Sequence, residues 1–223
     1  MQRRLYKLYT DGIGGYSPGG SCGTGYQRRF DHDQGRWISG EWRGMAFSHG
    51  RLSHHTVRGR SDRSFDHAMT VVGLNITTSD SAPISVKNGA VLQLKIEEDT
   101  TLNAGSGHAG ISVEACFSDD VGYEQERSGH LIVEGEGTLT VNGGDAASGK
   151  GFGAGAGIGG DGYGPGNETG GDFGVVEIRG ANILATGGKA VNTNFGAGAG
   201  IGGGGGDGTW TYAGKVWIRG GEV

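Results

Sequence analysis

Apolar and polar residues alternate in short segments along the chain from residue 71 onward. Alternation with a period of two is typical of β-strands, and the Asn, Asp and Gly residues between the segments are typical of turns. The strands that this pattern predicts are Gly73–Thr77, Pro83–Val86, Val91–Ile96, Thr101–Ala104, Ala109–Val113, Leu131–Gly135, Thr138–Val141, Ala156–Ile158, Val175–Ile178, Asn182–Ala185, Ala199–Ile201 and Val216–Ile218.

One glycine-rich motif occurs twice. FGAGAGIGG stands at Phe152–Gly160 and again at Phe195–Gly203. Each copy is followed by a loop of Gly, Asp and aromatic residues, and then by a strand that ends in Ile-Arg-Gly, at Val175–Gly180 and Lys215–Gly220. Two copies in register indicate a repeat architecture.

The predicted strands fall into groups of three, which predicts an all-β parallel solenoid (β-helix) with three short strands per coil. A single coil cannot bury its apolar residues, but coils stacked at the spacing of hydrogen-bonded strands build a continuous core. We expect three inward ladders, formed by Ile111, Ile158 and Ile201, by Val133, Ile178 and Ile218, and by Leu139 and Ile183.

Composition and charge divide the chain into two segments. Residues 1–70 carry eleven Lys and Arg against six Asp and Glu, whereas residues 71–223 carry eight against eighteen. The second segment is therefore acidic and a poor candidate for nucleic-acid binding, and it suits neutral glycans or divalent cations better. Fifty-one glycines without a Gly-X-Y period exclude collagen.

Residues 1–70 mix Arg, His and aromatic residues without strand or helix periodicity, and we expect an irregular leader there. One alternative is a basic, aromatic arm for an anionic partner. Another is an out-of-frame translation joined to the repeat near Met69–Val72. We expect the β-helix to occupy residues 71–223 and to be truncated within a repeat at its C-terminal end. No membrane span is predicted, and no signal peptide is visible.

The segment Leu74–Val223 resembles the glycine-rich β-helix repeats of large surface proteins from gut Firmicutes and related bacteria. The matching residues are TLTVNGG, FGAGAGIGG, VVEIRGANILATGG, the second FGAGAGIGG and VWIRGGEV. The segment is more distantly similar to carbohydrate-binding and pectate-lyase-like β-helix modules. The resemblance implies a right-handed helix, an extracellular or cell-surface location, and a structural or adhesive role.

Acidic residues follow the predicted AGI strands, and in stacked coils their loops lie along one edge. Calcium prefers several carboxylate or carbonyl oxygens, so these acids are candidate calcium ligands. The alternative is that Asp and Gly simply form turns. The candidate ligands are Asp161, Asp172 and Asp207.

Aromatic and arginine residues on the same edge and on the following strands are candidate carbohydrate contacts, because aromatic faces flanked by polar groups hold sugar rings. In VWIR, Val216 and Ile218 point inward, so Trp217 and Arg219 point outward, like Glu177 and Arg179 one coil earlier. The alternative is that a further segment covers Trp217. The candidates are Trp210, Tyr212, Trp217, Tyr163, Arg179 and Arg219.

No catalytic arrangement emerges. Arg179 and Arg219 are expected to stack as like charges, with Glu134 near enough to pair with Arg179. His108 and His130 are interpreted as solvated turn residues. The expected function is a structural or adhesive β-helix repeat module of a cell-surface or secreted protein, for adhesion or glycan binding. The alternatives are a polysaccharide-degrading enzyme, in which such an arginine is the base, and a fragment without a function of its own. An open solenoid end also predicts self-association.

Overall fold

A computed structural model gives the structure of the protein and describes residues 30–31, 36–37, 55–59, 65–87, 89–118, 122–123, 128–146, 153–162, 164, 171–191, 196–206 and 214–223. Within these residues the chain forms β-strands and contains no helix, so the all-β prediction is confirmed there. No helix in the described part of the chain could cross a membrane.

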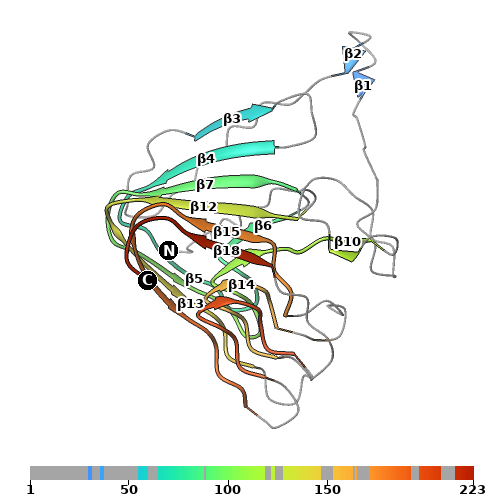
Figure 1. The fold of residues 1–223 in the computed structure, drawn as a ribbon, viewed down its shortest axis with the longest axis vertical. Helices are drawn as coiled ribbons and strands as arrows, with labels where there is room; N and C mark the ends of the chain where they lie inside the picture. The colour runs from blue at the N-terminus through green and yellow to red at the C-terminus, as the bar shows by residue number, and fades with distance from the viewer. Residues whose placement is uncertain are drawn as a thin grey trace, which may run out of the picture.

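Three sheets of short strands contain most of this structure (Figure 1). The strands are parallel throughout, except that β3 is antiparallel to β4. The first sheet contains β3 (His55–Gly59), β4 (Phe65–Val71), β7 (Val91–Ile96), β12 (His130–Gly135), β15 (Val175–Ile178) and β18 (Lys215–Ile218). The second contains β5 (Asn75–Thr77), β8 (Thr100–Asn103), β13 (Thr138–Asn142) and β16 (Asn182–Thr186), and the third contains β6 (Ile84–Val86), β9 (Ile111–Val113), β14 (Ile158–Gly159) and β17 (Ile201–Gly202).

From β4 to β18 the chain visits the first, second and third sheets in that order and then begins again. We call each set of three strands, one from each sheet, a repeat. Two small antiparallel pairs lie outside the repeats. They are β1 (Phe30–Asp31) with β2 (Arg36–Trp37), and β10 (Phe117–Ser118) with β11 (Gly122–Tyr123).

The first sheet extends into the segment that was expected to be irregular. Strand β4 begins at Phe65, and it pairs with β7 on one side and with β3 on the other. The proposed boundary between residues 70 and 71 therefore falls inside β4. Most of residues 1–70 lie outside the described residues, so the division into two segments stays a prediction.

The core lies between the three sheets and is built from ladders of aliphatic side chains. In the third sheet Ile111, Ile158 and Ile201 are aligned in register. In the first sheet Val133 and Ile178 are aligned with Ile218, and in the second sheet Leu139 is aligned with Ile183. The register of all three predicted ladders is therefore confirmed, but Ile218 is exposed and Ile201 is only partly buried at the last positions of two of them. Most of their side chains are fully buried.

The glycine-rich segments pack backbone against backbone, which explains their composition. A Cβ atom built on Gly155 would lie 1.9 Å from the carbonyl oxygen of His108 in the preceding repeat. Gly159 has a φ of 135°, and its Cβ would lie 1.9 Å from the oxygen of Gly202 in the following repeat. No side chain fits at either position, so both must be glycine.

The apolar side chains of the last strands are less buried than those of the earlier strands. Leu184, Val216 and Ile218 are exposed by 59%, 38% and 57%. They line an open hollow together with Ile201 of β17 and Val223. Unpaired strand edges beside exposed apolar residues favour association, and the predicted self-association at this end stays a prediction.

Candidate functional site

The outer surface of the first sheet carries the charged and aromatic residues that the sequence singled out. In β15, Val176 and Ile178 are buried in the core, so Glu177 between them lies on the opposite face. Glu177 is aligned with Trp217 of β18. Arg179 and Arg219 directly follow these two strands at equivalent positions.

Both arginines converge on Glu177. The Nε of Arg179 donates to Glu177 Oε1 at 2.9 Å, and its Nη2 donates to Oε2 at 3.1 Å. The Nε of Arg219 lies 2.7 Å from Oε1 of the same carboxylate. The predicted like-charge stack is therefore bridged by a carboxylate from the strand itself. Glu134, the partner expected from the sequence, contributes only a longer-range attraction to Arg179.

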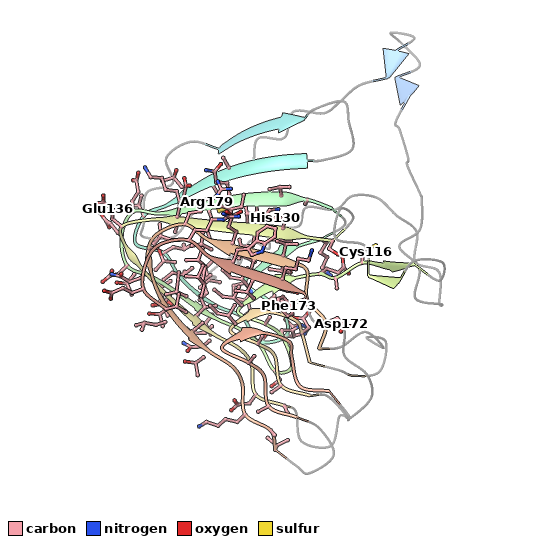
Figure 2. The ribbon with its side chains drawn as sticks, in the orientation of Figure 1. Cys116, His130, Glu136, Asp172, Phe173 and Arg179 are labelled. Atoms are coloured by element: carbon pink, nitrogen blue, oxygen red, sulfur yellow. The ribbon has the colours of Figure 1, made fainter. Side chains whose placement is uncertain are left out.

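His130 and Trp217 complete this group, which we call the Glu177 cluster: Glu177, Arg179, Arg219, His130 and Trp217. The Nε2 of His130 lies 3.7 Å from Glu177 Oε2, and its ring meets the Trp217 ring edge to face, with centroids 6.3 Å apart. The guanidinium carbon of Arg219 lies 5.5 Å from the Trp217 centroid, within the range of a cation–π contact. Figure 2 shows His130 and Arg179 over the strands of the first sheet.

The electrostatics of the cluster favour the charged forms of Glu177 and Arg179. The hydrogen bonds from Arg179 lower the pKa of Glu177, burial opposes this, and the charges of Arg179, Arg219 and His130 lower it further. The same hydrogen bonds raise the pKa of Arg179. Arg179 is therefore held in its protonated form, which is the wrong state for a general base.

The sequence identified Trp217, Arg179 and Arg219, and the structure brings these three together. It did not identify Glu177 as their common partner, and the interpretation of His130 as a solvated turn residue is wrong. His130 begins β12 and its side chain is only 26% exposed. The signal for Glu177 was its position between two inward residues, two places before Arg179 in the sequence.

The other aromatic candidates cannot be placed relative to this cluster. Tyr163, Trp210 and Tyr212 lie outside the described residues, as does the candidate calcium ligand Asp207.

Two of the candidate calcium ligands are described. The Oδ1 of Asp161 accepts a hydrogen bond of 2.7 Å from the backbone N–H of Ala109, and its Oδ2 lies 3.5 Å from Nδ1 of His108. Asp161 therefore links two successive repeats. Asp172 is 9% exposed, and Figure 2 shows it beside Phe173 and away from His130 and Arg179.

Asp161 and Asp172 do not belong to a cluster of metal-ligating side chains in the described part of the chain. Among the described residues no group of three or more His, Cys, Asp or Glu side chains could hold a metal ion. Because Asp207 lies outside those residues, the calcium site stays a prediction.

A second polar surface lies where strands β5, β8 and β13 of the second sheet end. Asn142 donates through Nδ2 to Oδ1 of Asn103 at 2.8 Å, and Asn103 donates to the hydroxyl of Thr77 at 3.1 Å. This ladder ties three repeats together and borders a shallow hollow that also includes Ser106 and Asp145. The described residues that line the hollow include no aromatic side chain, so the hollow offers a sugar ring a poorer stacking surface than the Glu177 cluster does.

The chain was compared with protein families, curated proteins and solved structures. No protein-family model, no curated protein and no solved structure matches it.

Proposed function

We propose that this chain is a right-handed parallel β-helix module of a cell-surface or secreted protein and that it binds carbohydrate. The repeated visiting order of the three sheets supports the β-helix. Right-handedness is supported by the strong preference of parallel strands for right-handed crossover connections. The resemblance of the glycine-rich repeats to bacterial surface proteins motivates the extracellular or cell-surface location.

The observation that carries the binding proposal is the Glu177 cluster. On the outside of a parallel sheet it presents an indole ring beside the Arg219 guanidinium group, and the Arg179 guanidinium group lies on the shared Glu177 carboxylate. Sugar-binding sites combine an apolar ring with a few oriented polar groups in this manner. Because β15 is hydrogen-bonded to a strand on each side, the site is held by a rigid element rather than by a loop.

The alternative of a polysaccharide-degrading enzyme receives less support from the same cluster. An arginine that removes a proton needs a lowered pKa, and the pKa of Arg179 is raised instead. We therefore prefer a binding and adhesive role to a catalytic one.

A glycan array probed with the full-length chain, followed by isothermal titration calorimetry on the sugars retained, tests the proposal. We expect Trp217→Ala to weaken binding by at least about tenfold, or about 1.4 kcal/mol, since the variant removes the apolar ring on which the sugar packs. Leu184→Ala is the matched control, because it removes an exposed apolar side chain from the second sheet.

Circular dichroism must show that both variants keep their β-structure. Retention of no sugar on the array, or equal affinities for the wild type and Trp217→Ala, would contradict the proposal.

A further inference from the structure

The Glu177 cluster carries more positive than negative charge. Two guanidinium groups share one carboxylate, and His130 adds a further positive charge when it is protonated. Residues 71–223 as a whole are acidic. The charge of the cluster itself is thus opposite in sign to that of the segment that contains it, although Glu134 outside the cluster exerts a longer-range attraction on Arg179.

The positive groups are also the ones that a ligand can reach. The Glu177 side chain is only 5% exposed, whereas those of Arg179 and Arg219 are 45% and 61% exposed. An approaching molecule therefore meets the guanidinium groups and not the carboxylate beneath them. Interactions between opposite charges across such a surface provide both attraction and selectivity.

Glu177 also orients the two arginines. Arg179 donates from Nε and Nη2 to the two oxygens of the Glu177 carboxylate, which fixes the plane of its guanidinium group. Arg219 forms an ion pair with the same carboxylate, its Nε 2.7 Å from Oε1. A guanidinium group has five N–H donors, and a planar fork of donors matches a carboxylate or sulfate group. Because the arginines are already held in place, binding costs them less side-chain entropy than it would cost freely rotating arginines.

Trp217 adds to the charged groups of the site an apolar ring against which a sugar can pack. Its ring lies beside the Arg219 guanidinium group and on the same outer surface. A free inorganic anion would contact only the arginines, whereas a charged sugar would contact the arginines and the ring together.

We infer that the Glu177 cluster binds a glycan that carries an oxyanion, either a uronic acid carboxylate or a sulfate ester. The oxyanion lies on Arg179 and Arg219, and the sugar ring lies against Trp217. This inference rests on the proposed carbohydrate-binding function and replaces the neutral glycan that the overall acidity favoured.

Calorimetry on the full-length chain at low salt tests the inference with two pairs of probes. One pair is a hyaluronan oligosaccharide and its carboxyl-reduced form, and the other is dextran sulfate and dextran. We expect at least one charged probe to bind about tenfold or more tightly than its uncharged partner, and added NaCl to weaken that binding. The pair that shows the difference identifies the oxyanion as a carboxylate or a sulfate.

Variants of Arg219 test whether this side chain binds the oxyanion of the glycan. Arg219→Gln should weaken binding of the charged probe about tenfold and weaken any binding of the uncharged probe by a smaller factor. Arg219→Lys keeps the charge but not the fork of donors, so its affinity should be intermediate. Leu184→Ala should have no effect. If Arg219→Gln fails to fold, Arg219→Lys and the salt titration of the wild type still decide the question.

Two results would overturn the inference in distinguishable ways. Equal affinity for charged and uncharged probes, with both lost in Trp217→Ala, would refute the charge requirement and leave the proposed carbohydrate binding intact. Binding of a charged probe that is insensitive to both Arg219 and Trp217 would refute this site. Failure of all four probes would also reject the inference, and a glycan array would then decide separately whether the protein binds another sugar.

Discussion

Truncation of Ile158 to alanine tests whether the stacked ladders stabilise this protein. Ile158 is fully buried and lies in the third sheet between Ile111 and Ile201. Its side chain thus has an aliphatic neighbour in the repeat on each side. Ile201 occupies the same position in the last described strand of that sheet and is only partly buried. The pair Ile158→Ala and Ile201→Ala therefore compares the same change inside the stack and at its end.

The size of the effect follows from burial. The Ile158→Ala change removes three carbon atoms, at about 0.8 kcal/mol each, or about 2.4 kcal/mol in lost burial. Neighbouring repeats on both sides cannot collapse into the space, so the cavity raises the cost to about 3–4 kcal/mol. Among the described strands, Ile201 has such a neighbour on one side only. Its truncation should cost about half as much.

Urea unfolding of the full-length chain, followed by circular dichroism, measures both changes in the free energy of unfolding. The reasoning would be refuted if Ile158→Ala cost less than about 1 kcal/mol. It would also be refuted if Ile201→Ala were as costly as Ile158→Ala, because burial at the two positions would then be equal.

Three further changes have defined outcomes. Gly155→Ala places a Cβ atom against the His108 carbonyl, 1.9 Å away, and should destabilise the protein by more than about 2 kcal/mol in urea unfolding. An unchanged midpoint of urea unfolding would show that the backbone at Gly155 has room for a methyl group, which would contradict the contact with His108. Asp161→Ala removes the acceptor for the buried Ala109 N–H and should cost about 1–3 kcal/mol in the same assay. A wild-type melting temperature that falls on addition of EDTA would support calcium at this edge, whereas no change is expected if Asp161 acts only through its hydrogen bonds. For Glu177 the pKa is lowered in the folded state from a reference of 4.5, so the unfolded chain takes up the proton first as the pH falls. The stability that Glu177 contributes is therefore present above pH 4.5 and is lost as the pH drops through the folded value. Wild-type stability, measured by urea unfolding over a pH series, should fall more steeply in this range than that of Glu177→Gln, and parallel curves would contradict the assignment.

The ladders were predictable because they depend on the sequence of each strand alone. A β-strand places alternate residues on opposite faces, so Ile111, Ile158 and Ile201 share a face once the repeats are aligned. The glycines were equally informative, since the doubled FGAGAGIGG motif fixed the alignment of two repeats. The alternation within each strand and the spacing of the repeats were therefore sufficient to predict the parallel sheets.

The Glu177 cluster was only partly predictable. Alternation placed Glu177 and Trp217 on the outer face, but an outward residue is normally expected to be solvated. Glu177 is buried because Arg179 and Arg219, from two different repeats, lie over its carboxylate. Burial of this kind arises from side chains that meet only after the strands are stacked. The positive charge of the cluster also arises only after stacking, so the negative net charge of residues 71–223 gave no sign of it.

Strand β4 shows a different limit. Its sequence, FDHAMTV, has little of the expected alternation and lies at the edge of a segment without periodicity. It forms a strand because β7 offers it a parallel partner over six residue pairs. A tertiary partner can thus impose a strand on a weak local pattern.

The most direct test of carbohydrate binding at the Glu177 cluster is a chemical-shift map of the ¹⁵N-labelled full-length chain titrated with the tightest-binding glycan. The account predicts that the Trp217 indole N–H, the Arg219 Nε–H and the backbone amides of β15 and β18 shift together as the glycan is added. Shifts confined to another surface, such as the Asn103 and Asn142 ladder, would contradict it.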